Sequence, residues 1–234
     1  MKENILYFLV FLNLLLFATI GIIFTQIYEQ KKKDILEEPI IEEDKYQKEN
    51  YVLIGDSITD WYPVNEMFNK DFPIVENGLA GTKTSDILEK LPDLVYKYNP
   101  TKVFLLIGTN DLNVVDEDKD IEKTTNNIIK MVDEINKYRK YAEIYVQSIY
   151  PISKEVGNEA GHRTNEEIKT INQSLKEYCE TKEKCNYINM YDVLIDSNDN
   201  LKAEYTKDGL HITTEGYEVI TKELERYMEL WKNE

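Results

Sequence analysis

The sequence predicts an α/β protein, a three-layer αβα sandwich around a five-stranded parallel sheet, preceded by one N-terminal transmembrane helix. Three observations support this prediction. Short apolar runs rich in β-forming residues alternate with helix-length amphipathic segments, which is the pattern of βαβ units. Polar residues directly follow the ends of several of these runs. At the start of the chain, residues 5–24 contain no charged side chain.

The stretch Ile5–Phe24 predicts a membrane segment. At about 1.5 Å per residue, a helix of this length crosses a hydrocarbon core of roughly 30 Å. A cleaved signal peptide is the alternative, but the apolar run is longer than an h-region of about 7–15 residues, and no clear small-x-small pattern follows it. We therefore expect residues 1–25 to be an uncleaved anchor, with a cleaved signal sequence as the alternative.

Residues 26–49 are highly charged and lack a sustained apolar period. The densest acidic runs are Glu37-Glu38-Pro39 and Glu42-Glu43-Asp44. This composition predicts a linker that holds the following domain away from the bilayer. Residues 50–234 remain for one folded domain, which is long enough to enclose a sizeable core.

Within this domain, five apolar runs predict the strands of the sheet. They lie at about residues 51–54, 72–75, 102–108, 142–149 and 186–190. Apolar residues at helical spacing predict helices at about residues 84–98, 120–138, 165–179 and 214–231. Pro92 lies inside the first helix and predicts a kink or a break there. This order favours helices on both faces of the sheet.

The first candidate site residue is Ser57, which directly follows the first predicted strand. Ligands bind beyond the carboxyl ends of the strands in an open parallel sheet, so a hydroxyl there is placed for chemistry. A single serine at a strand end is more often a turn or cap residue. However, Asp208 and His211 lie three residues apart near the C-terminus. With Ser57 they can supply the nucleophile, base and orienting carboxylate of hydroxyl catalysis.

Two hydrogen-bond donors follow other predicted strands. Asn110 comes after the run 102–108, and Gly81 comes after the run 72–75. Donors aimed at a developing oxyanion are usually a large contribution to acyl-transfer catalysis. The Asn110 amide and the Gly81 backbone N–H are therefore candidates for an oxyanion hole.

Four sequence blocks together resemble those of the SGNH (GDSL-type) esterase and lipase family. They are Gly-Asp-Ser at 55–57, Gly81 after Asn77, Gly-Thr-Asn-Asp at 108–111 and Asp-Gly-Leu-His at 208–211. Four blocks in the right order are a strong signal, whereas Gly-Asp-Ser alone is weak. The Gly-x-Ser-x-Gly pattern of α/β-hydrolases is absent around Ser57. The resemblance therefore implies the SGNH, flavodoxin-like form of the αβα sandwich.

The resemblance also implies a role for each matching residue. Ser57 would be the nucleophile and the first oxyanion donor, with Gly81 and Asn110 as the other two donors. Asp208 and His211 would complete the triad. The implied activity is hydrolysis of a carboxylic ester with a short acyl group such as acetyl, for instance on a carbohydrate. The alternatives are an O-acyltransferase acting on a cell-envelope glycan and a catalytically silent envelope-binding module.

Charge and motif content argue against other classes of function. The formal net charge of −16 disfavours a nucleic-acid partner, because phosphate binding requires a basic surface. The sequence shows neither the ligand spacing of a zinc site nor a glycine-rich phosphate loop. We therefore expect no metal and no cofactor, and an ester of a small molecule or glycan as substrate.

Several residues near the motifs allow two interpretations. Asp56 is a second candidate for the triad acid, but it precedes Ser57 directly and is expected to bond the local turn. Trp61 and Tyr62 either stack on a sugar or close the core, and we expect packing. His162 lies in a polar loop without a partner motif, so we expect a solvated side chain.

The sequence gives conflicting evidence on membrane orientation. Lys31-Lys32-Lys33 follow the apolar segment and outnumber Lys2 before it, which by the positive-inside rule favours a cytoplasmic domain. Long domains translocate largely regardless of charge, and Cys179 and Cys185 are either free thiols or a small disulfide suited to an oxidising compartment. Anchored members of the resembled family often act on extracellular esters. We therefore expect an anchored extracellular domain, or a secreted one if the segment is cleaved.

Overall fold

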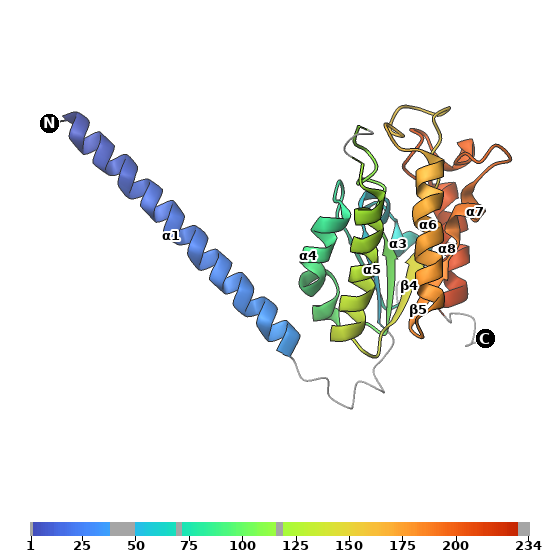
Figure 1. Cartoon of the computed structure of the whole chain (residues 1–234), viewed down its shortest axis with the longest axis horizontal. Coiled ribbons are helices and arrows are strands. Elements are labelled where there is room, and N and C mark those ends of the chain that lie inside the picture. Colours follow the sequence, from blue (N-terminus) through green and yellow to red (C-terminus); the bar gives the residue numbers. More distant parts are fainter. Residues whose placement is uncertain (1, 38–49, 69–71, 116–118, 229–234) are drawn as a thin grey trace. The chain divides into compact units, whose positions relative to one another are not determined.

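The computed structural model describes residues 2–37, 50–68, 72–115 and 119–228. The chain divides into two compact units, Met1–Ile41 and Glu42–Glu234. The first unit is a helical segment, and the second contains the sheet with its flanking helices (Figure 1).

Helix α1 (Lys2–Glu37) is the described part of the first unit. Among the described residues, one helical stretch is long and apolar enough to cross a membrane, Leu12–Asp34, with a mean hydropathy of 1.5. A helix of this kind near an N-terminus is either a membrane anchor or a signal sequence. The helix also continues through the first part of the predicted linker, because straight-chain residues such as Lys31–Lys33 have good helix propensity. The rest of that linker, residues 38–49, lies outside the described residues.

The second unit is built on a five-stranded sheet with the order β2-β1-β3-β4-β5. Every neighbouring pair of strands is parallel. The strands are β1 (Tyr51–Gly55), β2 (Ile74–Gly78), β3 (Lys102–Leu106), β4 (Glu143–Gln147) and β5 (Cys185–Ile188). The predicted α/β fold with a five-stranded parallel sheet is therefore confirmed.

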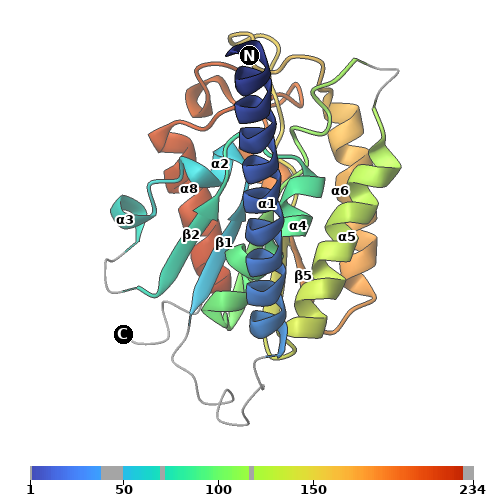
Figure 2. The ribbon, with the colours of Figure 1, turned by 90° about the vertical axis from the view of Figure 1, so that its left-hand side faces the viewer.

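Helices cover both faces of this sheet (Figures 1 and 2). One face carries α4 (Thr84–Leu94), α5 (Ile121–Tyr138) and α6 (Asn165–Glu180), with α5 between the other two. The other face carries α8 (Thr214–Leu224), which contacts α3 (Val64–Met67) and α7 (Met190–Leu194). The remaining short elements are α2 (Ser57–Asp60) and the 3-10 turns η2 (Tyr96–Tyr98), η4 (Ala203–Tyr205) and η5 (Glu225–Tyr227).

The core is divided between the two faces by the alternation of side chains along the strands. Leu53 of β1 and Phe104 of β3 belong to one buried cluster with Tyr217 and Leu224 of α8. Successive side chains of a strand point to opposite faces, so the buried Ile54 points toward the α4, α5 and α6 layer. Burial on both faces explains why the central strands β1 and β3 are largely apolar runs in the sequence.

The end of the sheet differs from the prediction. β5 stops at Ile188, and Met190 begins helix α7 instead of ending the strand. The cause is local, because the side chain of Asn189 accepts a hydrogen bond from the backbone N–H of Asp192 and caps the helix. Local capping therefore ended an apolar run that the sequence pattern assigned to one strand.

Two helix ends also differ from the prediction. α4 ends at Leu94, two residues after Pro92, and the 3-10 turn η2 follows it. This matches the break that Pro92 predicts. α8 ends at Leu224 and gives way to η5, earlier than the expected end near Trp231, which lies outside the described residues.

The two cysteines form a disulfide in the structure. Cys179 lies near the end of α6, and Cys185 begins β5. Their Cα atoms are 4.8 Å apart. Of the two states that the sequence left open, the structure therefore contains the bridged one.

Candidate active site

Ser57 is the first residue of α2 and is separated from the end of β1 by one residue, Asp56. The helix cap is Asp56, whose Oδ1 accepts a hydrogen bond of 3.0 Å from the backbone N–H of Ile58. The interpretation of Asp56 as a turn-bonding residue is therefore confirmed. Because Asp56 supplies the cap, the Ser57 hydroxyl does not have to bond its own helix.

Asp208 and His211 belong to a tight turn that we call the acid–base turn, residues 206–211. Asp208 Oδ1 accepts hydrogen bonds from the backbone N–H groups of Leu210 (2.9 Å) and His211 (2.8 Å). Thr206 Oγ1 accepts a bond of 2.9 Å from the N–H of Gly209. These short-range bonds hold the carboxylate and the imidazole in one local unit.

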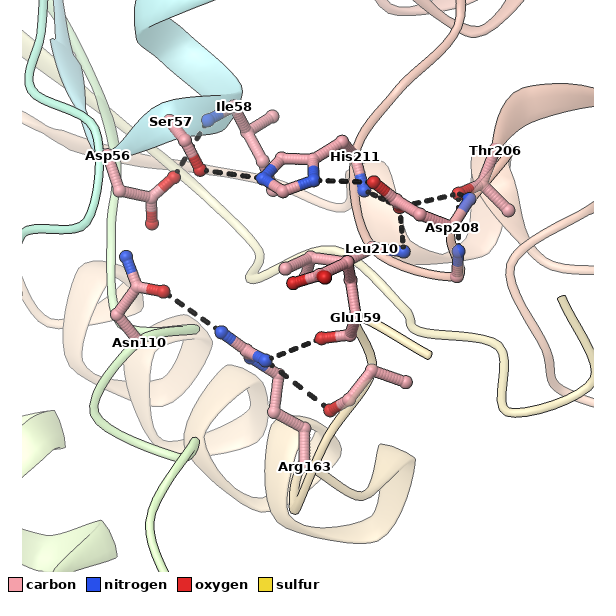
Figure 3. A network of polar contacts seen from close by, with 12 residues as sticks. Asp56, Ser57, Ile58, Asn110, Glu159, Arg163, Thr206, Asp208, Leu210 and His211 are labelled. Carbon is pink, nitrogen blue, oxygen red and sulfur yellow. Dashed lines mark hydrogen bonds and ion pairs between the residues drawn. The ribbon is translucent and has the colours of Figure 1, made fainter. Parts of the chain in front are cut away.

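The structure brings Ser57 to this turn and joins the three predicted triad residues in one line (Figure 3). Ser57 Oγ lies 3.1 Å from His211 Nε2. On the far side of the ring, His211 Nδ1 lies 2.7 Å from Asp208 Oδ2. A carboxylate accepts only, so Nδ1 carries the proton and Nε2 faces the serine as an acceptor. This arrangement can draw a proton from a hydroxyl.

The loop after β4 packs against the acid–base turn and forms two backbone hydrogen bonds with it. Glu159 donates its backbone N–H to the Asp208 carbonyl, and Ser153 donates to the Gly209 carbonyl, both at 2.9 Å. Gly157 has a φ of +61°, and a Cβ there would lie 2.5 Å from the Asp208 Cα. A glycine is therefore needed where the loop passes the turn.

The pKa values of the two carboxyl groups near Ser57 are shifted in opposite directions. Burial raises the pKa of Asp56 to about 7, against the lowering effects of the Ile58 N–H and the Arg163 charge. Burial also acts to raise the pKa of Asp208, but the hydrogen bonds from the His211 ring and from backbone N–H groups outweigh it and lower that pKa. Pairs of carboxyls shifted apart in this way commonly take different roles. Asp208 is the one kept ionised to face His211.

The predicted oxyanion donors lie in loops at the same edge of the sheet. Gly81 follows β2 with a left-handed φ of +76°. Asn110 follows β3, and its Nδ2 donates a hydrogen bond of 3.0 Å to the carbonyl of Thr82, the residue after Gly81. The two predicted donors therefore belong to loops in direct contact. The amide of Asn110 has a second N–H for another acceptor.

Sequence reasoning missed Arg163, which contacts this side of the site. Its Nη2 donates a hydrogen bond of 2.9 Å to Asn110 Oδ1, and Figure 3 shows the Asn110 amide between Asp56 and Arg163. Arg163 lies in a polar loop without a motif, 53 residues from its partner in sequence. The sequence carries no periodic or local signal for such a contact.

The adjacent aromatic residues Trp61 and Tyr62 have different environments in the structure. Tyr62 is buried, stacks on Tyr217 with ring centroids 4.9 Å apart, and has the packing role expected of it. Trp61 is 53% exposed, and its ring centroid lies 4.2 Å from that of His211. The expectation of a packing role for Trp61 is therefore wrong, because the turn of α2 directs it to the surface beside the imidazole.

Two other residues near the motifs have roles that do not involve the Ser57 and His211 pair. His162 is exposed, as expected from the sequence, and its backbone N–H donates to Asn113 Oδ1. The carboxylate of Asp111 accepts hydrogen bonds from the backbone N–H (2.9 Å) and the hydroxyl (2.6 Å) of Thr84, and so anchors the start of α4. In the part of the chain that the structure describes, no group of three or more His, Cys, Asp or Glu side chains is arranged to hold a metal.

Comparison with known families gives one match over most of the second unit. The model of the GDSL-like lipase/acylhydrolase family matches residues 53–219. The matched segment contains all the predicted site residues, from Ser57 to His211.

Among curated proteins, the chain is similar to the N-acylneuraminate cytidylyltransferase of Escherichia coli O18:K1:H7. The two are 30% identical over 174 residues, which is 74% of this chain but 38% of the relative. The chain therefore spans well under half of that protein.

Solved structures share the fold. One is a protein from Streptococcus pneumoniae that is named after platelet activating factor. It is 29% identical to this chain, the match covers 90% of this chain and 99% of that protein, and the TM-score is 0.72. An acetylxylan esterase from Geobacillus stearothermophilus is 18% identical, covers 78% of this chain and 94% of its own, and has a TM-score of 0.59. At the latter identity the likeness concerns the fold.

Proposed function

This chain belongs to the GDSL-like lipase/acylhydrolase family and is a carboxylic ester hydrolase of that family, and from this premise we propose that it removes a short acyl group, such as acetyl, through Ser57, His211 and Asp208. The observation that carries the proposal is the continuous chain of hydrogen bonds from Ser57 Oγ through both ring nitrogens of His211 to Asp208.

The first half-reaction forms an acyl-enzyme. His211 Nε2 takes the proton of Ser57 as its oxygen attacks the ester carbonyl carbon, and Asp208 stabilises the resulting imidazolium. The carbonyl oxygen becomes an oxyanion, which is bound by the N–H groups of Ser57 and Gly81 and by the Asn110 amide. When the tetrahedral intermediate collapses, His211 returns the proton to the leaving alcohol.

The second half-reaction repeats these steps with water. His211 takes a proton from water, the hydroxide attacks the acyl carbon, and the same three donors bind the oxyanion. Collapse breaks the bond to Ser57, which regains its proton from His211. The products are the free carboxylic acid and the starting enzyme.

A carbohydrate as the alcohol half of the ester is supported by Trp61. Its exposed indole stands beside His211, which handles the leaving alcohol, so an attached sugar can stack on it. The acetylxylan esterase with the same fold acts on an ester of this class. We therefore propose an acetylated carbohydrate as the substrate class.

The test is hydrolysis of p-nitrophenyl acetate by the full chain in detergent micelles. Ser57→Ala should lose essentially all activity above background, because the attacking oxygen is gone. Ser174→Ala is the matched control, since this half-buried serine donates to the Thr170 carbonyl within α6. Wild-type hydrolysis by Ser57→Ala would overturn the proposal.

The same preparation tests the two alternative functions. Acyl transfer to an added sugar acceptor at the expense of hydrolysis would identify an O-acyltransferase that uses the same residues. Failure of the folded wild type to react with a fluorophosphonate probe would identify a silent binding module. Reaction with the probe and release of free acetate support the esterase.

For localisation we propose that α1 anchors the protein in the membrane and that the second unit is extracellular. The membrane-length stretch Leu12–Asp34 and the disulfide between Cys179 and Cys185 support this arrangement. Protease added to intact cells should digest the second unit, and alkylation of non-reduced protein should modify neither cysteine. Protection from protease or two free thiols would argue for a cytoplasmic location.

A further inference from the structure

Arg163 is a buried cation held only by neutral oxygens in its hydrogen bonds. Its side chain is 2% exposed. Nε donates to the Thr109 carbonyl (2.8 Å), and Nη1 donates to the carbonyls of Glu159 (2.9 Å) and Ala160 (3.4 Å). Burying a charge is costly even when it is hydrogen-bonded, and the carboxyl groups of Asp56 and Glu159 interact with this one electrostatically. This raises the question of what the charge does.

The remaining donor, Nη2, reaches Asn110 Oδ1 at 2.9 Å. The Asn110 amide is thereby held at both ends, since its Nδ2 donates to the Thr82 carbonyl at 3.0 Å. The guanidinium only donates and the carbonyl only accepts, so a flipped amide would lose both bonds. Arg163 therefore determines which end of the amide faces the Thr82 side of the site.

The charge of Arg163 also acts on the amide electronically. A cation that donates to the amide oxygen withdraws electron density from the nitrogen and makes its N–H groups stronger donors. The effect is larger in a buried site, where the effective dielectric constant is low. It matters most when the acceptor becomes negative, as an oxyanion does.

We propose that Arg163 is a positioning residue of the oxyanion hole, which orients and polarises the Asn110 amide without touching the substrate. The inference rests on the proposed function, because it concerns the oxyanion that Ser57 generates. It also explains why Thr109 and Asn110, two neighbouring residues, are both bound by one side chain. The guanidinium fixes the backbone before the amide as well as the amide itself.

The main test is the kinetics of Arg163→Gln in the full chain, with p-nitrophenyl acetate. Removal of one oxyanion donor costs about 10²–10³-fold in kcat, and loss of its positioning residue should cost less, about 10-fold. KM should stay within about 2-fold, because the amide acts mainly in the transition state. Arg163→Lys retains the charge without the planar fork and should recover part of kcat.

A double-mutant cycle separates positioning from a general structural effect. If Arg163 acts through Asn110, Arg163→Gln should change kcat by less than about 2-fold in an Asn110→Ala background. An undiminished loss in that background would overturn the inference. If Arg163→Gln does not fold, the same cycle with Arg163→Lys decides the question.

Arg139 provides a matched control. It is 6% exposed and donates to the backbone carbonyls of Tyr96 and Tyr138, neither of which is a site residue. Arg139→Gln should lower thermal stability and leave kcat of the folded protein within about 2-fold of wild type. An equal fall in kcat for Arg139→Gln and Arg163→Gln would show that burial of an arginine, and not its contact with Asn110, is responsible.

Ser57→Ala in the same series distinguishes failure of this inference from failure of the proposed function. Activity in Ser57→Ala would overturn both, because no oxyanion would then form at Ser57. An inactive Ser57→Ala together with additive effects of Arg163 and Asn110 would overturn the role of Arg163 alone.

Discussion

The two sides of the candidate site are built in different ways. The acid–base turn holds Asp208 and His211 by bonds that span three residues or fewer. The other side, which we call the oxyanion side, consists of Ser57, Gly81, Asn110 and Arg163. Its defining contacts join Asn110 to Thr82, 28 residues away, and to Arg163, 53 residues away.

This difference indicates how each side responds to change. The side-chain geometry of the acid–base turn comes from its own few residues, and two backbone hydrogen bonds from the loop after β4 add to its stability. A side assembled from several loops depends on the whole sheet to bring those loops together, so a change in one loop reaches the others. Substitutions on the two sides should therefore differ in size and in how strongly they couple.

Among substitutions that leave the Ser57 nucleophile in place, the largest effect is expected on the local side, from Asp208→Asn. Two backbone N–H groups hold Oδ1, so the new amide nitrogen takes the place of Oδ2 and faces His211 Nδ1. The ring proton then moves to Nε2, which can no longer accept from Ser57. We expect kcat to fall by about 10⁴-fold, as for the corresponding change in serine proteases.

The matched control for Asp208 is Asp196, which accepts backbone N–H groups in a different turn. Asp196→Asn should leave kcat unchanged. If Asp208→Asn retained more than about a tenth of wild-type kcat, the turn would not be the catalytic acid–base unit.

On the oxyanion side, Asn110→Ala should lower kcat by about 10²–10³-fold, or roughly 3–4 kcal/mol of transition-state stabilisation. The measurement is steady-state hydrolysis of p-nitrophenyl acetate. Asn77 is the control, because its amide donates to the Leu94 carbonyl and accepts from the Tyr98 hydroxyl, neither of which belongs to a predicted site residue. A kcat for Asn110→Ala like that of Asn77→Ala would remove Asn110 from the proposed hole.

A third prediction concerns Asp56, the buried carboxyl between the two sides. Because its pKa is raised to about 7, the folded protein keeps this proton between about pH 4 and 7 while the unfolded chain releases it. The free energy of unfolding therefore falls as the pH rises through that window. Asp56→Asn does not titrate, so relative to wild type it should gain on the order of 2 kcal/mol between pH 5 and pH 8.

Thermal unfolding followed by near-ultraviolet circular dichroism at the two pH values measures this change. The difference in Tm between Asp56→Asn and wild type should shift in favour of the variant at pH 8. A difference that does not vary with pH would mean that Asp56 is already ionised in the folded protein at pH 5.

The smallest effect is expected from Trp61→Ala. The indole stacks beside His211 but is half exposed, so its loss should leave p-nitrophenyl acetate hydrolysis within about 2-fold. With an acetylated sugar, loss of about 1 kcal/mol of stacking should raise KM by roughly 5-fold. Equal effects on both substrates would argue against a sugar-binding role.

Much of the second unit could be predicted from the sequence. The central strands β1 and β3 are largely apolar and buried at every residue, so pattern and structure agree there. The edge strand β2 starts two residues later than the predicted run 72–75 and extends through Glu76 and Asn77. The prediction was wrong where local chemistry overrode the pattern. Asn189 capped a new helix at Met190, where the sequence pattern predicted the end of a strand.

The candidate site divides in the same way. Spacing alone placed Asp208 and His211 in one turn, and motif order placed Ser57, Gly81 and Asn110 at strand ends. Neither could find Arg163, because a buried arginine in a polar loop looks like any solvated one until its loop is folded. Spacing also could not tell that Tyr62 is buried and Trp61 exposed, because the direction of adjacent side chains depends on the folded backbone.

The sequence by itself therefore determined the fold class, the strands and the acid–base turn, because these depend on apolar patterning and on bonds between residues close in the chain. The tertiary structure alone decided how Asn110 is oriented, that Arg163 lies behind it and that Trp61 stands open beside His211. Those features arise where loops from different strands meet at one edge of the sheet, and no short stretch of sequence contains both partners.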